Sequence, residues 1–190
     1  MKNGQKWVVV KIDDKIAAIS TSYSHLAAIT AKLANSKSTV YQKICAETVD
    51  FEQIWELRQN TGWEDLLLFG TDFQKRVWRK LYELTHTPGQ ATRLISYSDF
   101  AELCENKAGV RAVAHAIGLN PSSVIIPCHL VIPKESIDNI ANIQKKAEST
   151  IFKGDDICVE SLLKEKGIDF GEYAQGRKTK KELILLELSK

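Results

Sequence analysis

An apolar run with a proline, a cysteine and a histidine at its centre constrains this chain most. The run spans Ile125–Ile132 and reads Ile-Ile-Pro-Cys-His-Leu-Val-Ile. We expect it inside the protein, because burial removes its apolar side chains from water. Burial alone raises the pKa of a thiol and leaves it unreactive, so a functional Cys128 needs a base or a positive charge nearby. The run therefore predicts either an inert core cysteine or an activated nucleophile.

His129 is the nearest candidate base for Cys128. Adjacent side chains do not face each other on a helix and point to opposite sides of a strand, so a direct hydrogen bond between the two is awkward. A bridging water, or a turn after Pro127, would bring the two groups within reach. On its own, the pair fits a buried cysteine with an incidental histidine better than a catalytic pair. Other segments of the sequence must decide whether Cys128 is an inert core residue or a nucleophile.

Composition sets broad limits on location and partners. The chain has 190 residues, 44% of them apolar and 26% charged, which is ordinary for a globular protein with a core. Its net charge of +2 neither supports nor excludes DNA, which would have to meet a local basic surface. The start has no signal-like pattern and no apolar run approaches roughly 18 residues, so we expect no membrane partner and a cytoplasmic protein, nuclear in a eukaryote. Scattered cysteines without CxxC spacing predict free thiols and no metal site: Cys45, Cys104, Cys128 and Cys158.

The first 69 residues predict a small α/β unit that acts as a scaffold. Apolar segments Trp7–Ile12 and Ile16–Ser20 flank the polar turn Asp13-Asp14-Lys15, which is typical of a hairpin. Further expected elements are helices over 25–33 and 51–58, a β segment around 39–45 and a buried strand over 65–69. This region shows no group of residues with obvious chemistry.

A second unit is expected to begin at residue 70. Thr71 has N-capping character, and apolar residues recur at helical spacing through Phe73–Leu84. Two short helices follow, over Ser98–Cys104 and Gly109–Gly118, in the manner of a helix-turn-helix. Small side chains on the second helix would let it lie close to a DNA groove while reading few bases. This predicts DNA binding with little sequence preference.

Several motifs follow one another in order along the second half of the chain. They are Gly70-Thr71-x-Phe73-Gln74-x-x-Val77-Trp78-x-x-Leu81, Ser96-Tyr97, Arg111-Ala112-Val113, Asn120-Pro121 and Ile126-Pro127-Cys128-His129. Together they resemble the O6-alkylguanine-DNA alkyltransferases, the methylated-DNA-protein-cysteine methyltransferases. The resemblance spans residues 70–132 and resumes over 171–187.

The resemblance implies a fold, an activity and a partner. The fold would be a ribonuclease-H-like α/β domain over residues 1–69 and a mostly helical winged-helix or helix-turn-helix domain over 70–190, with an insertion at about 133–169. The protein would be a monomer that binds duplex DNA through the minor groove and flips out O6-alkylguanine. It would transfer the alkyl group to its own cysteine once, irreversibly and without a cofactor. Alkyl size and activity on O4-alkylthymine stay open.

Motif matching also implies a role for each site residue. Cys128 would accept the alkyl group, His129 would take its proton through a water, and Glu187 would orient the imidazole. Asn120 would hold the hinge before the active-site loop. The base would contact Tyr97, Ile117, Tyr173, Ala174 and the carbonyl of Val131. Arg111 would fill the vacated base stack, and the DNA would further contact Ser96, Ser98, Ala112, Ala114 and His115. Outside the family pattern, Tyr97 is more simply a core aromatic, and Arg111 and Glu187 are solvated.

Three features depart from the family pattern. Leu130 replaces the arginine that usually follows Cys-His, so a structural ion pair is expected to be missing. His115 stands where the recognition helix usually has a small residue, which bears on how closely it enters the groove. The insertion adds about thirty residues, more than a structureless loop usually holds, with short helices expected over 140–147 and 159–166. A surface excursion is its simplest interpretation.

Lys178, Lys180 and Lys181 form a late basic cluster, either solvated or touching phosphate.

Two other functions fit parts of the pattern. An alkyltransferase-like protein would bind the lesion without transfer, but such proteins lack the acceptor cysteine. A thiol hydrolase could use Cys128 and His129, but no separate oxyanion-hole motif or more distant histidine partner is apparent.

Overall fold

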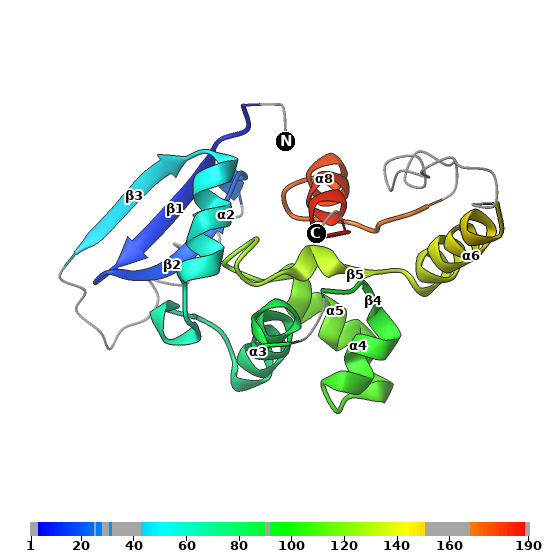
Figure 1. Cartoon of the computed structure of the whole chain (residues 1–190). Coiled ribbons are helices and arrows are strands. Elements are labelled where there is room, and N and C mark those ends of the chain that lie inside the picture. Colours follow the sequence, from blue (N-terminus) through cyan, green and yellow to red (C-terminus); the bar gives the residue numbers. More distant parts are fainter. Residues whose placement is uncertain are drawn as a thin grey trace.

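The chain folds into a small sheet and a group of helices that share one main core. The computed structural model describes residues 4–24, 26, 27, 31, 43–89, 92–150 and 168–188. Figure 1 shows the three-stranded sheet with α2 beside it at one end, and α3, α4, α5, α6 and α8 beyond. The strands are β1 (Trp7–Ile12), β2 (Lys15–Ser20), β3 (Ile44–Val49), β4 (Ile95–Ser96) and β5 (Val131–Ile132). The helices are α2 (Phe51–Asn60), α3 (Asp72–His86), α4 (Tyr97–Leu103), α5 (Val110–Gly118), α6 (Lys134–Thr150) and α8 (Arg177–Leu188).

The predicted N-terminal hairpin is confirmed. Strands β1 and β2 pair antiparallel, and the two residues between them, Asp13 and Asp14, have φ angles of 48° and 65°. Two consecutive positive φ angles define the tight turn whose twist matches that of paired strands, and aspartate tolerates this conformation. Strand β3 adds to the other edge of β1, giving the order β2-β1-β3.

Local signals predict the next helix correctly and the next strand wrongly. Helix α2 begins with a capping box in which Asp50 and Gln53 bond each other's backbone, as expected for a helix start. The buried strand predicted over 65–69 is absent; a 3₁₀ turn, η1 (Trp63–Asp65), is followed by a loop with one bridge from Leu66 to Ile16. The predicted helix over 25–33 and most of the β segment before Ile44 lie largely outside the described residues.

Helix α3 is confirmed and supports the helix behind the site. Thr71 caps its first turn by accepting from the backbone amide of Gln74 at 3.2 Å. Trp78 is fully buried, and its indole Nε1 donates to the carbonyl of Ala116 on α5 at 2.8 Å. Because a buried indole N–H needs an acceptor, this bond fixes α3 against α5.

The two helices predicted after residue 97 are both present. A 3₁₀ turn, η2 (Lys107–Gly109), joins α4 to α5, and the two helices pack together. Strands β4 and β5 pair in parallel, which places Ile95 beside Val131. The first residue of α4, Tyr97, is thereby held next to the chain that follows Cys128.

The start of the insertion packs against the folded body. The predicted helix over 140–147 lies within the longer α6, while the one over 159–166 falls outside the described residues. Ile140 packs with Ile132, Phe170 and Ile184 in a small second core. In addition, the hydroxyl of Ser136 donates to the carbonyl of Asp169 at 2.6 Å. The apolar face of α6 therefore anchors the chain leading back to the site.

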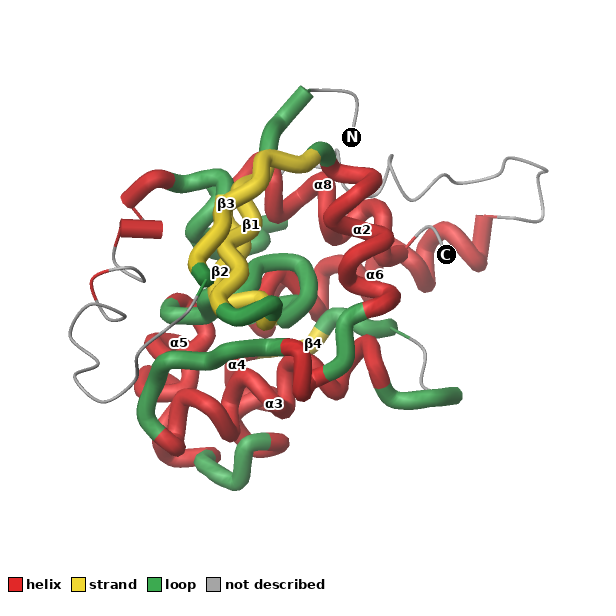
Figure 2. The backbone as a smooth tube through the Cα atoms, turned by 90° about the vertical axis from the view of Figure 1, so that its left-hand side faces the viewer, coloured by secondary structure: helices red, strands yellow, loops and turns green. Residues whose placement is uncertain are grey.

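The main core continues across the predicted boundary at residues 69 and 70. It contains Trp7, Ile19 and Ile54 from the N-terminal part together with Trp78 and Leu183. Figure 2 shows the sheet and α2 side by side above α3, α4 and α5. The two parts are therefore packed together through a shared apolar interior.

Strand β2 also bonds directly to the loop that precedes Cys128. The amide of Ile19 donates to the carbonyl of Pro121 at 2.8 Å, and the amide of Ser123 donates to the carbonyl of Ile19 at 3.2 Å. Gln175 reinforces this junction: its Oε1 accepts from the amide of Thr21 at 2.8 Å and from the hydroxyls of Ser20 and Thr21, both at 2.9 Å. Its Nε2 donates to the hydroxyl of Ser123 at 2.9 Å.

We expect Gln175→Ala to lower the free energy of unfolding by about 2–3 kcal/mol, because it removes the hydrogen bonds that Gln175 makes to Ser20, Thr21 and Ser123. Urea denaturation measures this change. Gln59→Ala, which truncates an exposed glutamine of α2, is the control and should stay within about 0.5 kcal/mol of wild type. Equal stability of the two variants would show that the Gln175 junction contributes nothing.

Candidate active site

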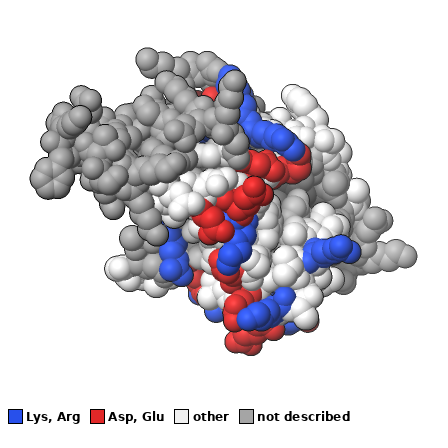
Figure 3. Space-filling view, turned by 90° about the vertical axis from the view of Figure 1, so that its right-hand side faces the viewer, with Lys and Arg blue, Asp and Glu red and all other residues white. Residues whose placement is uncertain are grey.

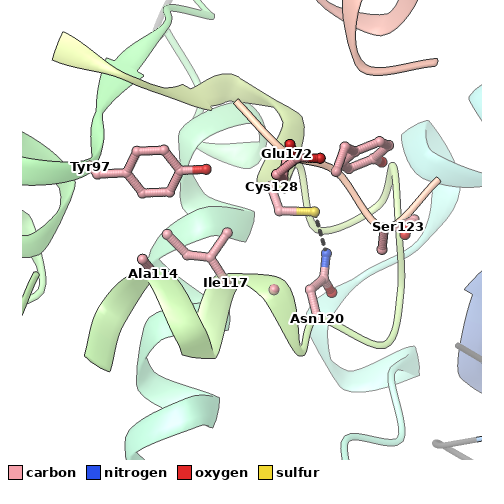
Figure 4. A pocket seen from close by; sticks show the side chains of 10 residues that line it. Tyr97, Ala114, Ile117, Asn120, Ser123, Cys128 and Glu172 are labelled. Carbon is pink, nitrogen blue, oxygen red and sulfur yellow. Dashed lines mark hydrogen bonds between the residues drawn. The ribbon is translucent and has the colours of Figure 1, made fainter. Parts of the chain in front are cut away.

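Cys128 lies at the start of a 3₁₀ turn, η3 (Cys128–Leu130), that begins after Pro127. The cysteine is 8% exposed, and its Sγ accepts a hydrogen bond from Asn120 Nδ2 at 3.0 Å (Figure 4). Burial raises the pKa of the Cys128 thiol, while the Asn120 bond and the charge of Lys180 act in the opposite direction. The resting thiol is therefore protonated, and a base is needed to make it a nucleophile.

Asn120 also fixes the loop that carries the cysteine. Its Nδ2 donates to the carbonyl of Ile126 at 2.8 Å, and its Oδ1 accepts from the amide of Ser122 at 3.0 Å. Between these two points, Val124 has a φ of 76°, an unfavourable conformation for a β-branched side chain. Such strain persists only where the surroundings determine the backbone, so the loop is tightly held.

A pocket of about 370 Å³ opens in front of Cys128. In Figure 4, Tyr97 points its hydroxyl across this pocket towards Cys128, with Ala114 and Ile117 below. Burial raises the pKa of Tyr97, so its hydroxyl stays protonated and can donate a hydrogen bond. The lining residues are Tyr97, Ala114, Ile117, Gly118, Asn120, Ser123, Cys128, Glu172, Tyr173 and Ala174.

His129 is buried behind Cys128 and bonded to the C-terminal helix. Its Nε2 lies 3.0 Å from Oε1 of Glu187 on α8. A carboxylate accepts from this nitrogen, so the neutral ring carries its proton on Nε2 and its lone pair on Nδ1. Nδ1 is buried and has no hydrogen-bond partner among the described residues. His129 therefore presents a free basic nitrogen.

The pKa values of this pair follow from burial and mutual contact. Burial lowers the pKa of His129, and the bond to Glu187 partly opposes that effect. For Glu187, burial would raise the pKa, but the hydrogen bonds from His129 and Arg58 outweigh it and lower the pKa to about 2. Glu187 is consequently a carboxylate throughout the physiological range, and His129 is neutral at rest.

Arg58 is a residue of the site that the sequence analysis missed. It lies on α2, is 6% exposed and donates from Nη1 to the same Glu187 oxygen that bonds His129. The N-terminal part is thus more than a scaffold. The helical spacing could have indicated that Arg58 is buried. It stands four residues after the fully buried Ile54, on the same face of α2.

Lys180 is a second residue whose place differs from the expectation for the late basic cluster. It is 1% exposed, and its Nζ donates to the carbonyl of Val131 at 2.8 Å. Burial lowers its pKa to about 8. Lys180 therefore neither contacts phosphate nor lies in solvent, and it occupies one of two lone pairs on the carbonyl predicted to bind the base.

The predicted DNA contacts are mostly on the surface of α5. Arg111, Ala112 and His115 are exposed and Ala114 is partly exposed. Ser98 is also partly exposed, but Ser96 is fully buried and caps α4 by accepting from the amide of Asp99 at 3.0 Å. A direct DNA contact by Ser96 would require exposure that this cap prevents. Among the described residues on the face shown in Figure 3, lysine and arginine lie among aspartate and glutamate, so no single sign of charge covers that part.

Two further classes of site are not found in the part of the chain that the structure describes. No cluster of three or more histidine, cysteine or acidic side chains could hold a metal ion there. None of the helices in that part is both long and apolar enough to cross a bilayer.

Residues 72–149 match the family described as 6-O-methylguanine DNA methyltransferase, DNA binding domain. A probable methylated-DNA-protein-cysteine methyltransferase of Acanthamoeba polyphaga mimivirus is 46% identical over 72 residues, which are 38% of this chain and 45% of the relative. The inducible methylated-DNA-protein-cysteine methyltransferase of Bacillus subtilis is 48% identical over 65 residues, 34% of each chain. These matches span less than half the length of either relative.

The fold as a whole is similar to a solved structure. The crystal structure of O6-methylguanine-DNA methyltransferase from Pyrococcus kodakaraensis superposes with a TM-score of 0.55 and 19% identity, covering 98% of this chain and 94% of that one. At this identity the likeness concerns the fold alone. It includes both the N-terminal sheet and the helices around Cys128.

Proposed function

We infer that this protein repairs O6-alkylguanine in duplex DNA by transferring the alkyl group to Cys128. The match of residues 72–149 to the DNA-binding-domain family of the 6-O-methylguanine DNA methyltransferases supports this inference. The observation that carries this proposal is the placement of the cysteine. Cys128 faces a pocket that also contains the Tyr97 hydroxyl, and it directly precedes the His129–Glu187 pair.

The reaction is one displacement at the alkyl carbon. The Cys128 proton passes through a bridging water to Nδ1 of His129, and Glu187 stabilises the imidazolium that forms. The thiolate then attacks the alkyl carbon; the S–C bond forms as the C–O6 bond breaks, and the electron pair stays on the guanine. Tyr97 donates a hydrogen bond or proton to that base. The thioether product has no route back to a thiol, so each protein molecule acts once.

The remaining pocket residues hold the flipped base. Tyr173, Ala174 and Ile117 form walls, and the carbonyls of Cys128 and Val131 accept from the guanine amino group, that of Val131 through its second lone pair. Asn120, just after α5, holds the loop that carries Cys128 through its bonds to Ser122 and Ile126. A modified guanine must leave the stack to reach the thiol, and damaged pairs cost less to open.

For DNA binding, we propose that the exposed face of α5 enters the minor groove. Arg111 fills the stack that the flipped base leaves, and Ala112, Ala114, His115 and Ser98 contact the groove with little sequence preference. In this view residues 70–190 form a winged-helix or helix-turn-helix unit, with the insertion at about 133–169. Residues 1–69 form a ribonuclease-H-like unit. The protein acts as a monomer in the cytoplasm, or in the nucleus of a eukaryote.

A repair titration tests the proposed function. Increasing amounts of a duplex with one O6-methylguanine are incubated with a fixed amount of protein, and the remaining lesion is measured after digestion to nucleosides. Repair should saturate at one lesion per protein molecule, because Cys128 is consumed. Continued turnover would indicate an enzyme with a regenerated site, and lesion binding without repair would indicate a damage sensor.

A further inference from the structure

Arg58 brings a buried positive charge from the N-terminal part of the chain to the back of the active site. Its side chain is 8% exposed and that of its partner Glu187 is 2% exposed. The guanidinium carbon also lies 4.6 Å from the centre of the Trp55 ring, close enough for a cation–π contact. The arginine is therefore held from two sides, by an aromatic ring of its own helix and by a carboxylate of α8.

The Glu187 carboxylate contacts this arginine and His129 through the same atom. A single oxygen, Oε1, accepts from both Arg58 Nη1 and His129 Nε2. Helices α2 and α8 are far apart in the sequence. The contact between Arg58 and Glu187 therefore links the N-terminal part of the chain to the C-terminal helix. The orientation of the His129 ring, and with it the direction of Nδ1, follows from the same contact.

We propose that Arg58 is a positioning residue for alkyl transfer, which holds the Glu187 carboxylate against His129 and keeps the imidazole neutral and correctly oriented before the reaction. This inference rests on the proposed function for its catalytic consequence. The arrangement of charges itself can be tested without any DNA.

The charges around His129 set the direction of the expected effect. Glu187 and Lys180 face the ring from α8 and Arg58 faces it from α2, while the thiol of Cys128 and the phenol of Tyr173 lie nearby. Glu187 favours the protonated imidazole, whereas Arg58 and Lys180 disfavour it. Removing the charge of Arg58 should therefore raise the pKa of His129. At a given acidic pH, more of the histidine would then be protonated and unable to accept the thiol proton.

The test compares three substitutions of Arg58. Arg58→Met removes charge and hydrogen bond, Arg58→Gln keeps a donor without charge, and Arg58→Lys keeps the charge. The pKa of His129 is read from NMR titration of the histidine ring signals, assigned with His129→Gln. Arg58→Met and Arg58→Gln should raise it, and Arg58→Lys should restore a value close to wild type.

Single-turnover transfer from the O6-methylguanine duplex gives the second readout. We expect Arg58→Met to lower the rate constant roughly tenfold at neutral pH, because a misplaced catalytic group loses its productive geometry. The acid limb of its pH profile should move to higher pH, as the pKa of His129 does. Rates are normalised to the fraction of protein that finally becomes alkylated, so that loss of folded protein does not count as loss of rate.

Arg79→Met is a matched control. Arg79 also pairs with a glutamate, Glu83 at 3.0 Å, and lies 5.0 Å from the centre of a tryptophan ring, Trp63, but it is on the surface of α3. Its variant should keep the wild-type rate and pH profile.

An unchanged pKa of His129 in both Arg58→Gln and Arg58→Met would overturn the inference, as would an unchanged rate constant and acid limb. If Arg58→Met does not fold, Arg58→Gln decides alone. A shifted pKa in a protein whose wild type transfers no methyl group would refute the proposed function instead, which keeps the two failures apart.

Discussion

Cys128→Ala is expected to abolish transfer of the methyl group from an O6-methylguanine duplex, because it removes the only sulfur that faces the pocket among the described residues. Binding of the lesion should persist, since the pocket walls and the exposed face of α5 are unchanged. Transfer is measured as loss of the lesion from digested DNA, and binding by fluorescence anisotropy at fixed salt concentration.

Cys45→Ala is the control for nonspecific thiol chemistry. Cys45 is exposed on β3, so a freely accessible thiol is removed while the site is left intact. This variant should repair at the wild-type rate. Residual repair by Cys128→Ala, or a loss of repair in Cys45→Ala, would assign the acceptor to another residue.

Glu187→Leu is expected to have the largest effect on stability. It leaves the Arg58 guanidinium buried without its carboxylate, and breaking a buried ion pair from one side typically costs about 3–5 kcal/mol. The free energy of unfolding is measured by urea denaturation at neutral pH. Glu83→Leu, which breaks the exposed Arg79 pair, should change it by about 1 kcal/mol or less.

The double variant Arg58→Met, Glu187→Leu separates the stranded charge from lost packing. It should recover much of the stability, because two apolar side chains replace the pair. Acid should act like Glu187→Leu: a carboxyl with a lowered pKa contributes stability above its unfolded-state pKa, and this is lost as pH falls towards about 2. Equal stability of Glu187→Leu and wild type would contradict the buried pair.

Elements specified by neighbouring residues could be predicted from the sequence. The Asp13-Asp14 turn and the Thr71 cap of α3 both depend on contacts within a few residues, and both are confirmed. The motif that contains Cys128 and His129, and from which their roles are predicted, is also a short stretch of the sequence. Interactions between neighbouring residues can be predicted from one sequence because no distant partner is needed.

Elements that depend on distant partners could not be predicted. Arg58 and Lys180 resemble solvated helix residues until α2 and α8 are placed, and only then do Glu187 and the Val131 carbonyl become their partners. The strand expected over 65–69 had the right composition, but Leu66 makes only one bridge to β2. Ile19, further along β2, pairs instead with Ser122 in the loop before Cys128.

Position 130, where the family usually has an arginine, gives one example of each kind. Leu130 is fully buried in the main core, where its apolar side chain can make no ion pair. A buried ion pair nevertheless joins the two parts of the chain, between Arg58 and Glu187. The sequence predicted the loss at position 130 but not an ion pair elsewhere.

Mass spectrometry of the wild-type protein after incubation with an O6-methylguanine duplex tests the central claim most directly. Intact mass should rise once by about 14 Da, the mass of a methyl group replacing a proton, and peptide mapping should place it on Cys128. An unmodified guanine duplex should add nothing. A protein that binds the lesion and keeps its original mass, or that carries the methyl group on another residue, would contradict the assignment of Cys128 as the alkyl acceptor.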